Sequence, residues 1–290
     1  MDTTSQDSDS DIYELLQIDN FKVKCIKNDL VITPYLKTGN LWGKNMEVII
    51  KELYEPDTNM IDIGAHIGTF TLIMSKYISK NSKIFSFEPV FYNLLEYNVN
   101  NNNLQDNVVI YNIGLSDRKT NCNGFLLDFG KKESFGCFSF EMNRIVELKF
   151  DSTINKDNLY INFEKLDSFG FKNISFIKID VEYFEKKILE GGVEFLSLNK
   201  PAILIELFLI TPILKIYDIK GNICEYSEKE KEVVKDNTFY CFSLLSILGY
   251  ICFPIIPASG EFLFIHKSKT NQLNKLIKIL SLTNFQPVIV

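Results

Sequence analysis

Short unbroken runs of apolar residues alternate along the chain with longer stretches whose apolar positions are spaced as on one face of a helix. Such runs, bounded by turn residues, predict buried strands, and the longer stretches predict helices. The expected strands are 60–63, 83–87, 108–113, 176–182 and 202–207, and the expected helices are 68–79, 90–101, 183–192 and 229–248. Strands that alternate with helices form a parallel sheet, so we predict an α/β fold.

The two ends of the chain depart from this alternation. Residues 12–36 carry short apolar runs that predict a small β element, and 39–54 predicts a turn and a helix. Late runs at 250–255 and 261–267 suit an antiparallel hairpin, and 269–282 suits a final amphipathic helix. The expected organisation is an acidic disordered tail at 1–11, an extension at 12–56 that packs on the core, and a domain at 57–290 with a β-rich insertion at about 117–163.

A charge-free stretch at 240–260 is long enough to be weighed as a membrane span. Gly249, Pro254 and Pro257 interrupt it, and these residues break regular structure. We interpret the stretch as a helix end, a strand and a loop, and we expect no membrane span.

The segment 59–68 carries the most informative motif. An apolar strand containing Asp62 leads into a turn with Gly64 and Gly68, and an amphipathic helix follows at once. A glycine-rich turn between a strand and a helix presents backbone N–H groups to a nucleotide-like ligand. The next strand is followed by Glu88, which is placed to accept hydrogen bonds from ribose hydroxyls. The motif therefore predicts a nucleoside-binding site.

The spacing of the two glycines narrows the choice of ligand. A dinucleotide-binding turn has the pattern G-x-G-x-x-G, whose extra glycine lets the backbone approach a pyrophosphate. This chain lacks that glycine, and Asp62 would repel a pyrophosphate. A carboxylate suits a cationic ligand, and S-adenosylmethionine carries a sulfonium, an ammonium and a ribose. We therefore predict S-adenosylmethionine as the cofactor and disfavour a nicotinamide-dependent oxidoreductase.

Three carboxylates mark the ends of two later strands. Asp180 and Glu182 lie two residues apart, so strand alternation places them on one face, and Glu206 ends the next strand. A carboxylate beside a reacting hydroxyl serves as a general base, and two close carboxylates raise each other's pKa. One alternative is that Asp180 only positions a ligand and Glu182 holds a loop. Another is that the three hold Mg²⁺ or Ca²⁺, although we expect no metal.

Composition excludes several classes of protein. The net charge of −6 and the isoelectric point near 5.2 argue against a nucleic-acid-binding surface. The six cysteines form no C-x-x-C pair and only two histidines exist, which disfavours a zinc site. Scattered cysteines of this kind are typical of reduced thiols, so we predict a cytoplasmic protein. The oligomeric state is left open.

Seven segments in order resemble the FkbM-type family of S-adenosylmethionine-dependent methyltransferases. They are MIDIGAHIGTFTL, IFSFEP, VVIYNIGLSD, FIKIDVEYFEKKILEGG, PAILIEL, LLSILGY and EFLFIHK. The resemblance spans about Met60 to His266, most of the chain. It implies a class I, Rossmann-like sheet of seven strands, the last one antiparallel, with the cofactor at the first two strand ends. It also implies O-methyl transfer to a hydroxyl of a sugar, glycan or other small molecule.

The resemblance also assigns roles to residues. The expected catalytic residues are Asp180, Glu182 and Glu206, and the expected cofactor-binding residues are Asp62, Gly64, Ala65, His66, Gly68, Glu88, Pro89 and Asp117. Five of the cofactor-binding residues have competing interpretations. Gly64 and Gly68 either let the backbone approach the ligand or only allow the helix to pack on the strand. Asp62 either reaches the amino group of methionine or caps local N–H groups, His66 either lines the pocket or is a surface turn residue, and Asp117 either lies near adenine or caps a turn.

One position departs from the family pattern. Tyr183 stands where the family has glycine after D-V-E, and tyrosine does not readily adopt a positive φ if the turn requires one. The tyrosine would alternatively fill part of the acceptor pocket. Glu185 and Lys186, on the following helix, are expected to face solvent. The departure at Tyr183 sustains a second hypothesis, a non-catalytic methyltransferase-like domain that serves as a scaffold or interaction module.

Overall fold

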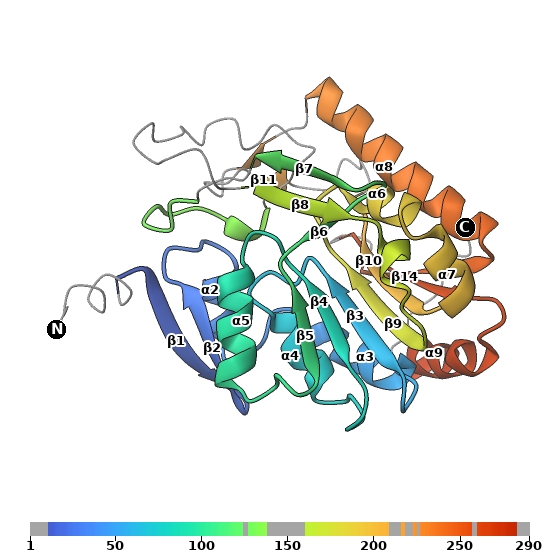
Figure 1. Cartoon of the computed structure of the whole chain (residues 1–290), viewed down its shortest axis with the longest axis horizontal. Coiled ribbons are helices and arrows are strands. Elements are labelled where there is room, and N and C mark those ends of the chain that lie inside the picture. The colour runs from blue at the N-terminus through green and yellow to red at the C-terminus, as the bar shows by residue number, and fades with distance from the viewer. Residues whose placement is uncertain are drawn as a thin grey trace.

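A seven-stranded sheet forms the centre of the computed structural model, which describes residues 11–123, 127–137, 160–208, 216–217, 223–224, 227–256 and 260–282 (Figure 1). The strand order is β13-β14-β10-β9-β3-β4-β5. The strands are β3 (Asn59–Ile63), β4 (Ile84–Phe87), β5 (Val108–Tyr111), β9 (Ile174–Ile179), β10 (Ala202–Glu206), β13 (Tyr250–Ile256) and β14 (Glu261–His266).

The pairing within this sheet is mostly parallel. Strands β10, β9, β3, β4 and β5 pair in parallel, whereas β14 pairs antiparallel with both β10 and β13. These pairings confirm the predicted α/β fold with a mostly parallel sheet and a terminal antiparallel hairpin. From β3 the chain continues outward to β4 and β5, and from β9 it continues in the opposite direction to β10. The border between β3 and β9 is therefore a switch point, where open α/β sheets place their ligands.

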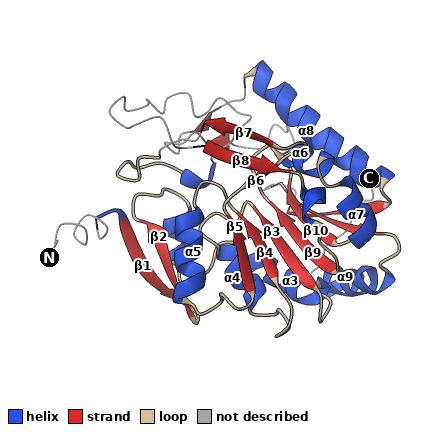
Figure 2. Cartoon of the chain, in the orientation of Figure 1, coloured by secondary structure: helices blue, strands red, loops and turns tan. Residues whose placement is uncertain are grey.

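Helices cover both faces of the sheet (Figure 2). They are α2 (Ile32–Leu36), α3 (Glu47–Leu53), α4 (Thr69–Ser75), α5 (Tyr92–Asn101), α6 (Glu185–Glu190), α7 (Val193–Asn199), α8 (Glu228–Ile247) and α9 (Thr270–Leu282). Alternate residues of each strand enter two separate apolar clusters. Met60 and Phe176 pack with α3, α4 and α5, while Ile61 and Ile177 pack with α6, α7 and α8. Burial on both faces explains why these strands read as unbroken apolar runs.

The residues before β3 form a hairpin and two helices. Strands β1 (Tyr13–Ile18) and β2 (Phe21–Ile26) pair antiparallel, as the short apolar runs predict. The buried Asn98 of α5 accepts a hydrogen bond from the Lys24 N–H at 2.7 Å and donates one to the Lys24 carbonyl at 3.0 Å. This exchange fastens β2 to α5. The proposed division at residues 12–56 stays a prediction, and the expected tail at 1–11 lies outside the described residues except for Asp11.

A second, three-stranded sheet has the order β6-β8-β7. Its strands are β6 (Gly114–Leu115), β7 (Thr120–Asn123) and β8 (Tyr160–Glu164). Figure 1 shows β7 and β8 above the upper ends of the main strands. The insertion predicted at 117–163 stays a prediction, since 124–126 and 138–159 lie outside the described residues. The described residues also include a two-residue antiparallel pair, β11 (Ile216–Tyr217) with β12 (Ile223–Cys224).

The charge-free stretch at 240–260 divides as predicted. It contains the end of α8 and the whole of β13, and 257–259 lie outside the described residues. No helix in the described part of the chain combines the length and apolar character that crossing a bilayer requires.

Candidate active site

A cavity of about 530 Å³ opens at the carboxyl edge of the sheet, at the switch point. Of the predicted site residues it is lined by Gly64, Ala65, His66, Glu88, Pro89, Asp180, Glu182 and Glu206. Asp62, Gly68 and Asp117 are not among its lining residues. Additional wall residues include Trp42, Phe91, Ile113, Phe135 and Glu261, none of which was predicted. The strand ends and turns that the sequence singles out therefore meet around one space.

Gly64 makes the junction between β3 and β9 possible. Its φ is +78°, and a Cβ atom there would lie 1.8 Å from the carbonyl oxygen of Asp180. Any side chain would therefore force the ends of the two strands apart. The backbone N–H of Asp180 donates to the Ile63 carbonyl at 3.0 Å, which fixes the approach. Gly64 thus sets the distance between the glycine-rich turn and the carboxylate cluster.

Glu88 links the turns that follow β3 and β4. Its Oε2 accepts the His66 N–H at 2.8 Å, and its Oε1 accepts the N–H groups of Val90 and Phe91 at 2.7 and 2.9 Å. Burial raises the pKa of Glu88, while the three N–H groups oppose that shift. A carboxylate has about four acceptor positions, so three bonds leave one position at the cavity wall for a ligand hydroxyl.

Two of the carboxylates predicted to bind the cofactor form hydrogen bonds with other side chains of the protein. Asp62 is buried, and its Oδ2 accepts the Thr71 hydroxyl at 2.6 Å. Burial raises the pKa of Asp62 to about 6. Asp117 accepts the Ser116 hydroxyl at 2.9 Å and pairs with Arg118 at 3.2 Å. The roles predicted for both residues toward the cofactor stay predictions.

His66 lies in the cavity wall rather than on an open surface. Its ring packs against Phe91 with the ring centroids 4.2 Å apart, and its φ is +51°. Its Nε2 is buried and has no hydrogen-bond partner among the described residues. Burial lowers the pKa of His66 to about 4, so the imidazole is neutral at pH 7. A neutral ring against Phe91 suits an apolar wall of the cavity.

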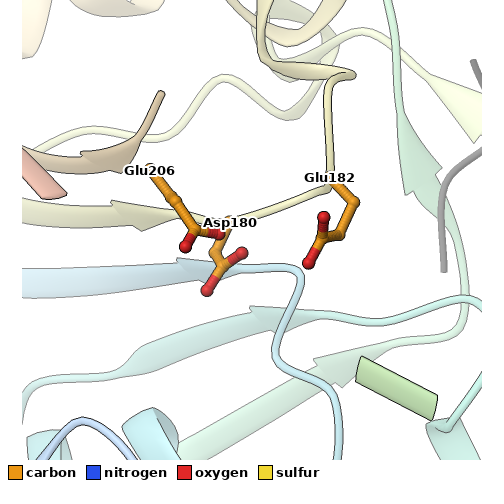
Figure 3. Close-up of side chains that lie close together, drawn as sticks. All are labelled: Asp180, Glu182 and Glu206. Atoms are coloured by element: carbon orange, nitrogen blue, oxygen red, sulfur yellow. The ribbon is translucent and has the colours of Figure 1, made fainter. Parts of the chain in front are cut away.

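The three predicted catalytic carboxylates line the cavity and lie close together (Figure 3). One carboxylate oxygen each from Asp180, Glu182 and Glu206 lies within 4.8 Å of the others. The Nζ of Lys178 lies 2.7 Å from the Asp180 Oδ2, and the lysine side chain is 1% exposed. Three carboxylates of this kind suit Mg²⁺ or Ca²⁺, but Lys178 already supplies a positive charge beside them. The expectation of no metal therefore stays a prediction.

The surroundings shift the pKa values of Asp180 and Glu206 in opposite directions. Burial favours the neutral form of Asp180, but the charge of Lys178 and a hydrogen bond from Glu206 prevail and lower its pKa. Burial raises the pKa of Glu206 well above its usual range, and the charges of Asp180 and Glu182 add to the effect. Asp180 therefore loses its proton at a lower pH than Glu206 does.

The turn after β9 corrects two predictions. Strand β9 ends at Ile179, so Asp180 and Glu182 lie beyond the strand and do not share a face by alternation. Glu182 and Tyr183 instead have φ values of +51° and +76°, in the left-handed region. Tyr183 thus adopts the conformation that suits glycine at this position. Its ring is buried and packs on the ring of Phe208, with the two ring centroids 4.8 Å apart. This packing offsets the backbone strain.

Glu185 does not face solvent, contrary to the sequence prediction. It is 1% exposed, and its Oε1 accepts the N–H groups of Val181 and Tyr183 at 3.3 Å each. Its Oε2 accepts the side-chain amide of Asn237, on α8, at 2.7 Å. A carboxylate with three donors can be buried, and here it holds the left-handed turn in place. Lys186 reaches Asp236 at the surface.

Substitutions at Tyr183 should reveal the backbone strain. We expect Tyr183→Gly to be more stable than Tyr183→Ala by about 1 kcal/mol, because only alanine retains the cost of a left-handed φ. Both should be less stable than the wild type, since each loses a buried ring. Urea unfolding measures the difference. At Leu198, exposed on the helix α7, the order should reverse. The same order at both positions would contradict strain at Tyr183.

Glu261 should make stability depend on pH. Burial raises its pKa to about 7 from the ordinary 4.5. Between these values the native state binds more protons than the unfolded state, so stability falls as pH rises. We therefore expect Glu261→Gln to stabilise the protein more at pH 8 than at pH 5, as measured by urea unfolding. Glu228→Gln, at an exposed position on α8, serves as the control. An equal effect at both pH values would refute the prediction.

The fold and the position of the cavity together indicate the class of protein. The chain is an open, mostly parallel α/β protein with its cavity outside the carboxyl ends of the strands. Residues 62–231 match the profile described as the Methyltransferase FkbM domain. That match covers more than half of the 290 residues, and the chain therefore belongs to the FkbM methyltransferase family. The resemblance recognised in the sequence is confirmed. Among curated proteins, none matches the chain significantly.

Solved structures of methyltransferases are among those to which the chain is similar. An FkbM methyltransferase from Methylobacillus flagellatus is 15% identical with a TM-score of 0.42, and the similarity covers 72% of this chain and 43% of that one. A precorrin-6y C5,15-methyltransferase from Geobacter metallireducens is 11% identical with a TM-score of 0.40, over 77% and 85% of the two chains. This chain thus spans less than half of the Methylobacillus protein.

Proposed function

We propose that the protein is an S-adenosylmethionine-dependent O-methyltransferase that acts on a hydroxyl of a sugar, glycan or other small molecule. The observation that carries the proposal is that Glu88 and the ionised Asp180 line the same cavity. In a family of methyltransferases, this arrangement supplies both an acceptor for the ribose hydroxyls and a base.

Each residue has a defined part in the proposed reaction. Glu88 accepts a ribose hydroxyl with its remaining acceptor position, and the backbone at Gly64 and Ala65 borders the methionine part of the cofactor. The bound cofactor supplies an electrophilic methyl group on a sulfonium. Asp180 accepts the proton that the acceptor hydroxyl loses as its oxygen forms the new O–CH3 bond, and the broken S–CH3 bond leaves a neutral thioether. Alignment of oxygen and methyl contributes much of the rate.

Calorimetry with S-adenosylmethionine tests the cofactor site. We expect the wild-type protein to bind S-adenosylmethionine and not to bind NAD. Glu88→Gln should weaken binding by about 10-fold or more, because a charged hydrogen bond contributes roughly 1.5–3 kcal/mol. Glu96→Gln is the matched control, since the Glu96 carboxylate accepts the Tyr92 hydroxyl and does not line the cavity.

Thermal unfolding must accompany these titrations, because Glu88 also accepts three backbone N–H groups. A folded wild type that does not bind S-adenosylmethionine would contradict the proposal and favour the scaffold hypothesis. A folded Glu88→Gln variant with unchanged affinity would place the ribose elsewhere.

A further inference from the structure

One wall of the cavity lies outside the family domain. Tyr35, Trp42, Gly43 and Asn45 line the cavity, yet they precede residue 62, where the family match begins. The rings of Tyr35 and Trp42 meet edge to face with their centroids 5.1 Å apart. Both side chains are half-buried and keep some accessible surface. An aromatic wall of this kind offers a large, rigid surface to the apolar face of a ligand.

A series of contacts connects this wall to the carboxylates that line the cavity. A Cβ atom at Gly43 would lie 2.4 Å from the ring of Phe70, so the backbone at Gly43 rests on that ring. The Nζ of Lys178 lies 4.6 Å from the centroid of the same ring and 2.7 Å from Asp180. A short series of contacts thus joins Trp42, through its neighbour Gly43, to the carboxylate that is the proposed base.

The cavity also offers hydrogen-bond acceptors. Asp180, Glu182, Glu206 and Glu261 all line it, and Glu206 is directly opposite Glu261 where β10 pairs with β14. The Oε2 of Glu261 is buried and has no hydrogen-bond partner among the described residues. No lysine or arginine is among the described lining residues, and Lys178 behind them is paired with Asp180. An anion here would meet the negative charges of Asp180 and Glu182, whereas hydroxyl or ammonium groups would find acceptor oxygens.

We infer that Trp42 and the carboxylates around Glu206 and Glu261 form the acceptor subsite, and that it selects a polyhydroxylated ring without negative charge. The apolar face of the ring packs on the indole, and its hydroxyl groups donate to the carboxylates. Trp42 is then a residue that determines specificity. This inference rests on the proposed function, because it names the kind of acceptor that the methyltransferase would take.

The chain offers a direct optical test, because Trp42 is its only tryptophan. Protein saturated with S-adenosylhomocysteine is titrated with methyl α-D-glucopyranoside, D-glucosamine and D-glucuronate while the tryptophan emission is recorded. The three probes share a six-membered ring and differ in charge. We expect saturable emission changes with the neutral and the cationic ring, and at least tenfold weaker binding of glucuronate. Equal or tighter binding of glucuronate would overturn the charge selection.

Two variants test the individual contributions. In saturation-transfer NMR, Trp42→Ala should lose the signal of the glucoside, whereas Phe239→Ala should keep it, since Phe239 is 77% exposed on α8. Glu261→Gln should reduce the discrimination against glucuronate. An unchanged glucoside signal in Trp42→Ala, with the protein folded, would exclude Trp42 from the subsite.

The titrations are repeated without S-adenosylhomocysteine. This repeat distinguishes a failure of the proposed methyltransferase function from a failure of the proposed acceptor subsite. Ring binding without any calorimetric binding of S-adenosylhomocysteine would keep the subsite and refute the proposed function. Binding of S-adenosylhomocysteine, with no response to any of the three rings in fluorescence or NMR, would refute the subsite alone.

Discussion

Replacing Lys178 with methionine should destabilise the protein by about 3–5 kcal/mol at pH 7, because it leaves the buried carboxylates without their cation. Lys178 is 1% exposed and lies 2.7 Å from Asp180. Although burial favours neutral lysine, the charges of Asp180, Glu261 and Glu206 outweigh it and raise the pKa of Lys178. Urea unfolding at equilibrium measures the loss.

A surface ion pair with the same N–O distance provides the control for this experiment. Lys186 lies 2.7 Å from Asp236, but the two side chains are 30% and 66% exposed. We expect Lys186→Met to change the free energy of unfolding by at most about 1 kcal/mol, since solvent screens such pairs. The double variant Lys178→Met with Asp180→Asn should recover part of the loss. Equal effects at both lysines would mean that Lys178 does not neutralise the cluster.

An exchange of functional groups between Glu185 and Asn237 should restore the stability that either single change removes. Glu185→Gln would set two amide donors against each other, and Asn237→Asp would set two carboxylates together, so each should cost about 1–3 kcal/mol. In the double variant the glutamine amide again donates to a carboxylate. Unfolding is measured at pH 8, because burial raises the pKa of Glu185 to about 7.

Amide exchange gives a local measurement of the same contact. The N–H groups of Val181 and Tyr183 donate to Glu185, so their exchange should accelerate in each single variant and slow again in the double variant. A coupling energy near zero between the two substitutions would show that α8 does not hold the turn.

The sequence predicted the sheet well because its strands are buried on both faces. Runs such as 60–63 and 202–207 have no polar face that would obscure them, and the glycines of the turn mark where β3 ends. The turn after β9 carried no such signal. Its left-handed residues are Glu182 and Tyr183 rather than glycine, and packing against Phe208 stabilises them.

The missed site residues depend on contacts that are distant in sequence. Glu185 looked solvent-exposed beside Lys186, because its partner Asn237 lies 52 positions further along. Glu261 meets Glu206 only through the pairing of β14 with β10. Lys178 did leave a signal, since a single charged residue inside the apolar strand β9 is buried on either face and therefore needs a partner.

The position of Trp42 before the family domain has an evolutionary consequence. Substitutions in the segment around Tyr35 and Trp42 would alter one wall of the cavity without touching Gly64 or Glu88. If Trp42 contacts the acceptor as inferred, acceptor preference would diverge between relatives while recognition of the proposed methyl donor stays the same. Two proteins that agree over residues 62–231 need not share a substrate, and a comparison aimed at the acceptor should align the residues before Asn59 instead.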